Sequence, residues 1–280
     1  MNVPIGFVIL SHSHSCQLLR LIDRLNVMFA HPPIVCHHDF YQCSFEPGVL
    51  PANVSFVTPH LQTAWAHFSI VEATIRAFDQ ICKSSESPDW IVLLSGNDYP
   101  IKSTSRILSD LNSNESDALM HCELIHPKSL KTTWHKSCYG RYCNSHDDML
   151  ALSEPKTPKA TLFSNGFNCY AGSQWFSARR HVVEYIVKFH KMSVDLFKHY
   201  AKSKAPDESY FHTIVANTVP PIKIDNNNWR YIDWSKGGAH PKTLVSSDLP
   251  HLLTSPAHFA RKFNMNIDVA ILDQLDEITA

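Results

Sequence analysis

Short apolar runs alternate with amphipathic segments through the first 120 residues of the chain. The apolar runs have the length of buried strands, and they lie at residues 5–10, 33–38, 54–57 and 90–94, with another near 118–123. The segments between them carry apolar residues at helical spacing, and they lie at residues 16–28, 66–83 and 103–111. Strands and helices that alternate in this way predict a largely parallel sheet wrapped by helices.

The rhythm breaks at residues 124–168, which are rich in Lys, Ser, His and Pro and show little periodicity. A segment of this length without regular structure is expected to run over a functional face of the domain. Beyond it, helices are expected near residues 179–192 and 207–216, with a short strand at 222–224 and a peripheral helix within 268–280. No internal repeat is visible, so the pattern favours one α/β domain.

The composition is that of an ordinary globular protein, and it excludes some partners. Hydrophobic residues make up 44% of the 280 residues and charged residues 18%, which is enough to bury a large core. The 25 basic residues are balanced by 26 acidic ones, which argues against a nucleic-acid binder held by phosphate contacts. The 18 histidines are scattered, so most are expected on the surface or satisfied within the core.

The amino-terminal residues and the cysteines favour a soluble protein in a reducing compartment. The first ten residues lack a basic region and a long apolar run, so we expect a strand there and neither a signal peptide nor a membrane anchor. The eight cysteines are irregularly spaced, and the near pairs Cys36/Cys43 and Cys138/Cys143 form no zinc knuckle. We therefore expect free thiols and a cytoplasmic location.

An acidic residue lies at the start of an apolar helical stripe in the carboxyl-terminal third of the chain. With Pro206 as the first helical position, Phe211 begins an inward apolar face, and Glu208 lies three residues before it on that face. Burying an unpaired carboxylate costs on the order of several kcal/mol, so an inward Glu208 requires a partner or a chemical role. The alternative is an acidic residue that only stabilises the first helical turn.

Seven segments of the chain follow one another in a characteristic order. They are VILSH (8–12), HHD (37–39), LSGNDYP (94–100), YAGSQWF (170–176), APDESYFHTI (205–214), RYIDW (230–234) and FARKF (259–263). Together they resemble the core-2/I-branching N-acetylglucosaminyltransferase and peptide O-xylosyltransferase family (glycosyltransferase family 14). The resemblance covers residues 4 to about 265.

The resemblance implies a single GT-A-like nucleotide-sugar transferase domain at residues 1–280, with a central mixed sheet flanked by helices. Residues 1–120 are expected to form the nucleotide-binding half, 124–168 a variable loop region, and 169–265 the catalytic and acceptor half. The implied reaction moves N-acetylglucosamine or xylose from a UDP-sugar to a hydroxyl of a glycan, lipid-linked sugar or peptide, with inversion to a β-linkage. The animal members carry an amino-terminal membrane anchor. Because no such anchor is expected in the first ten residues here, we expect a bacterial-type soluble member without a transmembrane segment.

Inversion requires one general base to take the proton from the attacking hydroxyl, and the resemblance gives this role to Glu208. The amino terminus of the expected helix would help to keep the carboxylate ionised. Asp207 is the rival candidate. It lies off the inward stripe and is expected to cap or frame the turn.

The departing diphosphate must also be stabilised, and the chain contains no Asp-x-Asp motif to hold a divalent ion. Its nearest substitute, Glu115 and Asp117, lies in a polar turn and is interpreted as a solvated loop. Arg261 and Lys262 match the basic pair that the family places near the diphosphate. We therefore expect no metal and no cofactor.

The family has a further Arg shortly before this basic pair, and the chain offers only His240 or Lys242 in its place. The second phosphate contact is therefore left open.

Other residues are candidates for the UDP-sugar site, each with a structural alternative. Ser11 and Asp39 follow the first two expected strands, where ligands of such sheets bind, although Asp39 is also a typical turn residue. Trp65 resembles a donor-site tryptophan or is a core lid, and the family usually has Gly in place of Ala66. Asp98 is a sugar contact or a turn residue.

Residues nearer the expected acceptor complete the site. Ser173 is expected to line the donor sugar pocket, and Trp175, Arg230 and Trp234 the acceptor side, where an aromatic face stacks on a sugar ring. A structural role is the alternative for each tryptophan.

Two other functions stay open at this point. One is a catalytically silent sugar-nucleotide or glycan-binding protein of the same fold, which would bind UDP without turnover. The other is a zinc hydrolase built on the many His and Cys residues, which their scattered spacing does not favour.

Overall fold

A mixed seven-stranded sheet runs through the centre of the protein. The computed structural model describes residues 4–46, 48, 50–84, 88–143, 162–238 and 240–279 of the chain. The strands, in their order across the sheet, are β10 (Ile224–Asp225), β6 (Ala118–Leu119), β9 (Ser177–Arg179), β4 (Trp90–Ser95), β1 (Ile5–Ser11), β2 (Ile34–His38) and β3 (Val54–Phe56). Strands β1 to β4 are parallel to one another, and β9 runs antiparallel between β4 and β6. The fold is therefore the α/β domain with a mixed sheet that the resemblance predicts.

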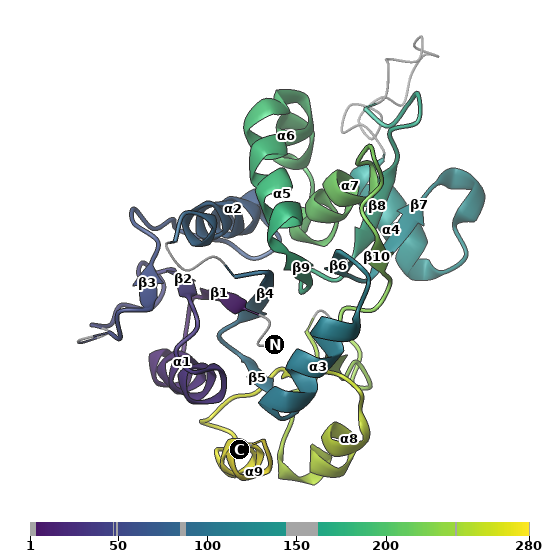
Figure 1. The fold of residues 1–280 in the computed structure, drawn as a ribbon. Helices are drawn as coiled ribbons and strands as arrows, with labels where there is room; N and C mark the ends of the chain where they lie inside the picture. Colours follow the sequence, from purple (N-terminus) through teal and green to yellow (C-terminus); the bar gives the residue numbers. More distant parts are fainter. Residues whose placement is uncertain are drawn as a thin grey trace.

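Helices cover both faces of this sheet, and β1 shows why its sequence is apolar throughout. Phe7 and Ile9 belong to a hydrophobic core on one face, whereas Val8 belongs to a core on the other face. Figure 1 shows α2 and α5 on one side of the sheet and α1 and α9 on the other. The helices are α1 (Ser15–Phe29), α2 (Phe68–Cys82), α3 (Thr104–Ser113), α4 (Thr133–Tyr142), α5 (Arg180–Met192), α6 (Val194–Tyr200), α7 (Tyr210–Ala216), α8 (Leu249–Thr254) and α9 (Ala270–Ile278).

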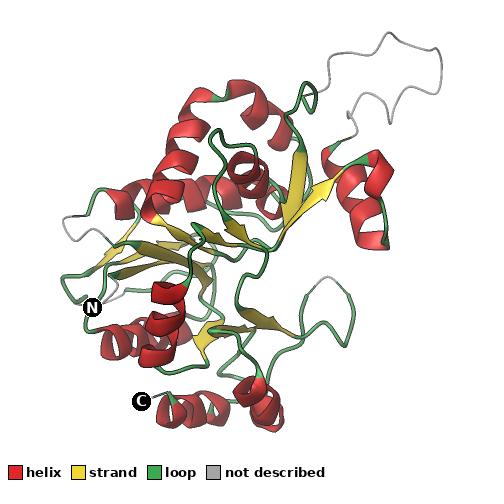
Figure 2. Cartoon of the chain, turned by 45° about the vertical axis from the view of Figure 1, so that its right-hand side comes forward, coloured by secondary structure: helices red, strands yellow, loops and turns green. Residues whose placement is uncertain are grey.

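Two smaller sheets extend the domain beyond the carboxyl ends of the central strands. One has the strand order β11 (Arg230–Ile232), β12 (Phe259–Arg261) and β5 (Asp98–Pro100). The other is the antiparallel ribbon of β7 (Cys122–Ile125) and β8 (Cys169–Gly172). In Figures 1 and 2 this ribbon reaches away from the central sheet, with α4 beside it.

The segment expected to be irregular, residues 124–168, contains regular structure. A 3-10 turn (Pro127–Ser129) and the helix α4 lie within it, and residues 144–161 fall outside the described part of the chain. Helix α4 was not expected because its apolar residues follow no clear stripe. Its start is nevertheless marked by Thr132, whose side chain accepts a hydrogen bond from the backbone N–H of His135.

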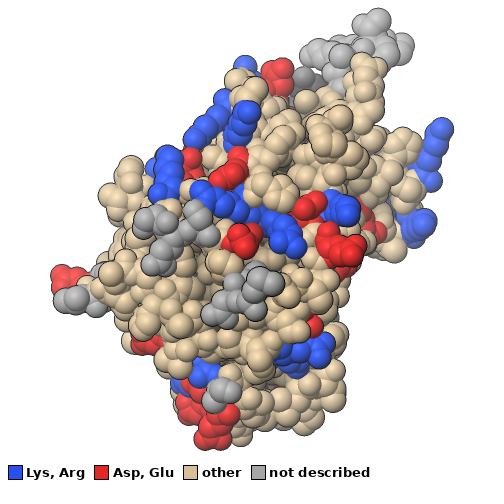
Figure 3. Space-filling model, in the orientation of Figure 1, with Lys and Arg blue, Asp and Glu red and all other residues tan. Residues whose placement is uncertain are grey.

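Three further features concern the cysteines, the helices and the surface charges. All eight cysteines are free thiols. In the described residues no helix combines the length and apolarity needed to cross a membrane. On the face shown in Figure 3, basic and acidic side chains lie next to one another, in keeping with their balanced numbers. The division into a nucleotide-binding half and an acceptor half stays a prediction.

Candidate active site

A cleft of about 1430 Å³ opens at the carboxyl ends of β1, β4 and β8 and is bordered by β11 and β12. Ligands of open α/β sheets bind at this edge. All predicted ligand contacts except Asp39 and Asp98 line it. These lining residues are Ser11, Trp65, Ser173, Trp175, Glu208, Arg230, Trp234, Arg261 and Lys262.

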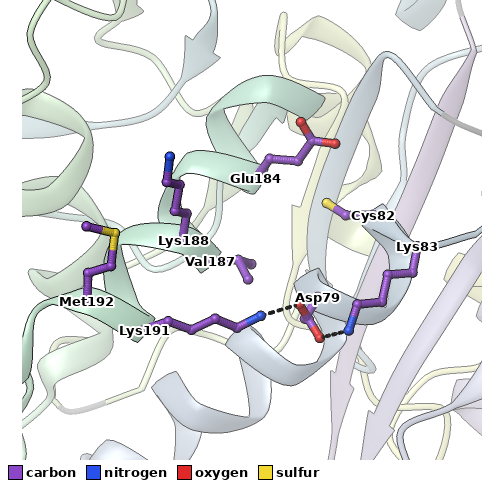
Figure 4. Close-up of a pocket in the computed structure, with 8 residues that line it drawn as sticks. All are labelled: Asp79, Cys82, Lys83, Glu184, Val187, Lys188, Lys191 and Met192. Atoms are coloured by element: carbon purple, nitrogen blue, oxygen red, sulfur yellow. Dashed lines mark hydrogen bonds and ion pairs between the residues drawn. The ribbon is translucent and has the colours of Figure 1, made fainter.

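A second, smaller hollow of about 330 Å³ lies between α2 and α5 (Figure 4). Three of its charged groups are engaged with one another, since Lys83 and Lys191 both pair with Asp79. Glu184 pairs with Arg180. None of the residues predicted to bind a ligand lines this hollow. The large cleft is therefore the candidate active site.

Glu208 reaches this cleft from a short turn and not from the stripe of a helix. Residues Pro206–Glu208 form a 3-10 turn, η2, and α7 begins only at Tyr210. Ser209 separates them with a φ of −143° and a ψ of −35°, outside the helical region, and its hydroxyl donates to the carbonyl oxygen of Tyr170. The predicted helix from residue 207 is therefore wrong at its start. The predicted inward face through Glu208 does not exist, and Glu208 is 40% exposed.

Arg141, which belongs to α4, holds the Glu208 carboxylate. Its Nη1 donates to Oε2 of Glu208 at 2.8 Å, and both residues line the cleft. The guanidinium is fixed on its own helix as well, 4.9 Å from the ring centroid of Tyr142 and 3.2 Å from Sγ of Cys138. Glu208, the expected base, is thus ion-paired with Arg141 within the lining of the cleft.

Asp207 is the buried carboxyl of this turn. It is 7% exposed, and its Oδ1 has no hydrogen-bond partner in the part of the chain that the structure describes. Burial raises the pKa of Asp207 to about 7, and the charge of Glu208 adds to the rise, whereas Arg141 and Arg261 oppose it. The expectation that Asp207 caps or frames the turn stays a prediction, and its raised pKa adds that the charges of Glu208, Arg141 and Arg261 act on this carboxyl.

Arg261 is fixed between a carboxylate and an aromatic ring. Pairing of β12 with β5 places it opposite Asp98, and its Nε lies 3.2 Å from Asp98 Oδ1. Its guanidinium carbon lies 4.4 Å from the ring centroid of Trp175. Asp98 itself is 1% exposed and accepts hydrogen bonds from the backbone N–H and the hydroxyl of Ser95. We therefore correct its expected role from a sugar contact to the buried counter-ion of Arg261.

Arg230 forms part of the cleft floor with most of its donors turned toward the protein. It is 8% exposed, and it donates to the backbone carbonyls of Leu93, Phe176 and Asn228. Its guanidinium carbon also lies 4.9 Å from the ring centroid of Phe259. This position supports a structural role more than the direct acceptor contact that we expected.

Asp39 lies behind the cleft wall and is fully satisfied. It is 0% exposed and accepts hydrogen bonds from Tyr41, from Gln42 and from both the backbone and the hydroxyl of Thr63. Burial opposes ionisation, but these hydrogen bonds outweigh it and lower the pKa of Asp39 to about 2. The predicted contact with the nucleoside is replaced by a turn that shapes the wall, whereas Ser11 does line the cleft.

Trp65 lies on the cleft surface, so its alternative role as a core lid is wrong. It is 64% exposed, with Lys204 and His240 at 5.8 and 5.7 Å from its ring. The next residue, Ala66, has a φ of 60°, the left-handed region that favours glycine, which explains why glycine suits this position. The carbonyl of Ala66 accepts a hydrogen bond of 2.8 Å from the backbone N–H of Ala205. The tryptophan turn is thereby joined to the turn that carries Glu208.

Of the two residues offered in place of the family's further Arg, only one lines the cleft. His240 does so, whereas Lys242 is paired with Asp248 at 2.5 Å and Asp233 at 3.7 Å. Lys262 also lines the cleft, next to Arg261. The cations available to a bound ligand are therefore carried by β12 and the residues just after it, with Lys204 on the other side of Trp65.

The acceptor side combines aromatic and small residues. Trp234 is 53% exposed and Trp175 is 6% exposed beneath Arg261. Gly172, the last residue of β8, lies opposite the start of β7, and a Cβ there would lie 1.7 Å from the carbonyl oxygen of His121, the residue just before β7. Only glycine allows this close approach, which brings Ser173 and Trp175 to the cleft wall.

No group of three or more His, Cys, Asp or Glu residues suited to a metal ion is found in the described part of the chain. The acidic pair Glu115 and Asp117 does not line the cleft. Asp117 instead accepts a hydrogen bond from the backbone of Lys223 and lies 3.4 Å from His181.

Comparison with known proteins gives the family of the chain. The family model described as core-2/I-branching enzyme matches residues 48–255. The chain belongs to the core-2/I-branching enzyme family. The resemblance inferred from the seven segments is therefore confirmed. The matched range includes Glu208 and ends before Arg261 and Lys262.

Three relatives of the chain are named as xylosyltransferases. The chain is 26% identical over 245 residues to a xylosyltransferase of Ciona intestinalis, which covers 80% of this chain and 27% of that protein. It is 25% identical over 253 residues to the xylosyltransferase oxt of Drosophila pseudoobscura pseudoobscura, with the same coverage. It is 25% identical over 248 residues to xylosyltransferase 2 of Homo sapiens, which covers 79% of this chain. The chain spans 27% of the length of each of these relatives.

Two cationic residues of the branching-enzyme cleft escaped prediction from sequence. Lys204 precedes the predicted segment 205–214 by one residue, and Arg141 lies in a helix that was not expected. The Thr132 cap was the available signal for that helix. Nothing local to the sequence indicates that Arg141 meets Glu208, because 67 positions separate the two residues.

Proposed function

We propose that this protein is an inverting glycosyltransferase that moves a sugar from a UDP-sugar to an acceptor hydroxyl. The observation that carries the proposal is one cleft that holds an accessible carboxylate, Glu208, together with the cations Arg261 and Lys262. Family membership supports the reaction class.

The proposed mechanism uses these three groups. The carboxylate of Glu208 accepts the proton of the acceptor hydroxyl as its oxygen attacks the anomeric carbon from the face opposite UDP. The bond between that carbon and the β-phosphate oxygen breaks, and UDP leaves with the bonding electron pair. Arg261 and Lys262 stabilise the diphosphate charge that develops, so no metal ion is required in this proposal. Inversion to a β-linkage follows from the single displacement.

The remaining cleft residues would hold the two substrates. Ser11, Trp65 and Ser173 are proposed for the UDP-sugar, and Trp175 and Trp234 for the acceptor. The exposed ring of Trp234 can stack on a sugar ring, whereas Trp175 lies beneath Arg261. The relatives named xylosyltransferase favour xylose over N-acetylglucosamine as the transferred sugar. The acceptor class, whether glycan, lipid-linked sugar or peptide, and a cytoplasmic location stay predictions.

A donor-hydrolysis screen tests this function without knowledge of the acceptor. Purified protein is incubated with UDP-xylose, UDP-N-acetylglucosamine and other UDP-sugars, and released UDP is measured. We expect one donor to be hydrolysed above the rate without enzyme and the Glu208→Gln variant to lose that activity. UDP binding without turnover, with any donor or acceptor supplied, would instead indicate the silent binding protein.

A further inference from the structure

The two carboxylate oxygens of Glu208 have different surroundings. Oε2 of Glu208 accepts from Arg141, whereas no described residue donates a hydrogen bond to Oε1. The side chain is 40% exposed on the cleft, so Oε1 is accessible to a hydroxyl that enters the cleft. We propose that Arg141 is the positioning residue of the general base, pinning one carboxylate oxygen so that the other faces the acceptor hydroxyl. This inference rests on the role proposed for Glu208.

Charge gives Arg141 a second effect. Asp207 adjoins Glu208 on the same turn, and two neighbouring carboxylates disfavour ionisation of one another. The arginine supplies the nearest compensating charge, since its partner atom is 2.8 Å away. Without it, the pKa of Asp207 would lie higher still, and the Glu208 carboxylate would lose its ion pair.

Among the other described elements packed around the turn, none supplies an ion pair to Glu208. On β12, Arg261 pairs with Asp98, although its charge also lowers the pKa of Asp207. On α2, Glu72 lies 3.5 Å from His190, and on α7, His212 is hydrogen-bonded to the carbonyl of Ser173.

The fold also separates positioning from scaffolding. The hydroxyl of Tyr142 donates to the carbonyl of Ala205 at 2.6 Å and so ties α4 to the start of η2 independently of the ion pair. Substitution of Arg141 leaves this link in place. A loss of activity in such variants can therefore be distinguished from loss of the turn.

The test is the pH dependence of kcat in three variants. In Arg141→Gln we expect kcat to fall about tenfold to a hundredfold, with the donor KM within about twofold of wild type. The acid limb of the profile should move to higher pH by about one unit. Arg141→Lys should restore most of kcat and return the acid limb most of the way to its wild-type position. Arg180→Gln is the matched control. Arg180 forms a comparable ion pair with Glu184, at 2.6 Å, and neither residue lines the cleft. Its pH profile should be unchanged.

Chemical rescue provides a second readout that a purely structural role would not give. The Arg141→Ala variant leaves a space on the cleft lining, so added guanidinium ion at millimolar concentration should restore part of its kcat. Tetramethylammonium, which cannot donate hydrogen bonds, should not.

The outcomes separate this inference from the proposed function. An Arg141→Gln variant that loses activity with an unmoved acid limb and no rescue would overturn the positioning role, as would an unchanged kcat. If Glu208→Gln itself retains activity, the proposed base is wrong, and the positioning role fails with it.

Discussion

Two walls of the cleft each contain a buried aspartate, and they shift its pKa in opposite directions. Behind one wall, Asp39 accepts hydrogen bonds from Tyr41, Gln42 and Thr63, and its pKa is lowered to about 2. In the other wall, Asp207 has an oxygen without a partner among the described residues, and its pKa is raised to about 7. Both side chains are almost inaccessible to solvent.

The difference indicates that Asp39 has a structural role, whereas Asp207 belongs to the part of the cleft where chemistry is expected. A carboxylate whose lone pairs are satisfied by its own turn contributes rigidity, and it has little capacity left for a ligand. A buried carboxyl such as that of Asp207, whose pKa is raised to about 7, can change its protonation state with the charge of what enters the cleft. We therefore assign chemistry to the wall of Glu208 and Asp207, and shape to the wall of Asp39.

The largest expected effect comes from removing the base. Glu208→Gln should lower kcat by about a hundredfold to ten-thousandfold, because the amide cannot accept the proton, while UDP affinity stays nearly constant. Steady-state kinetics and calorimetric titration with UDP measure the two quantities. Near-normal turnover would move the base to Asp207 on the same wall, or to another part of the cleft.

The second prediction uses the pH dependence of stability. Because the pKa of Asp207 rises from 3.8 to about 7 on folding, the unfolded state binds fewer protons between these values. Its contribution to stability is therefore lost as pH rises from about 4 to 7, by at most about 4 kcal/mol. Asp39 has a depressed pKa, so its contribution is present above pH 4 and is lost as pH falls toward 2.

Urea unfolding from pH 4 to 8 measures this contrast. Asp207→Asn should flatten the decline between pH 4 and 7, whereas Asp39→Asn should destabilise the protein throughout that range. Parallel profiles for wild type and Asp207→Asn would show that Asp207 is ionised in the folded protein.

The regular half of the fold could be predicted from sequence because its signals are local. Strands β1 and β4 are continuous apolar runs with both faces buried, and helices α1 and α2 carry clear apolar stripes. Their predicted bounds agree with the structure to within two residues. Periodicity alone was sufficient there.

The candidate site was predictable only in part, because long-range contacts decide it. Ser209 interrupts the expected helix through a hydrogen bond to Tyr170, a residue 39 positions earlier in the sequence. The burial of Asp98 follows from pairing of β5 with β12, which also cannot be read from either segment alone. The resemblance supplied Glu208 and the basic pair, whereas Arg141 required the structure.

A smaller effect is expected at the basic pair. Lys262→Ala should weaken UDP binding by about 1.5 to 3 kcal/mol, the size of a charged hydrogen bond, and should affect uridine far less. Arg261→Ala should do the same and also lower the melting temperature, because it leaves Asp98 buried without its counter-ion. Equal losses for UDP and uridine in Lys262→Ala would contradict a phosphate contact.

The smallest expected effect is that of metal removal. Fixed cations at Arg261 and Lys262 need no ion to arrive, so activity should survive excess EDTA and should not rise with Mn²⁺ or Mg²⁺. Glu115 and Asp117 are the acidic pair that the sequence offers for a metal, and Asp117→Ala is therefore the control variant. Activity that disappears in EDTA, returns with Mn²⁺ and is lost again in Asp117→Ala would transfer the leaving-group chemistry away from the cleft. EDTA-sensitive activity that Asp117→Ala leaves intact would instead place a metal within the cleft itself, and the role of Arg261 and Lys262 would then need a new assignment.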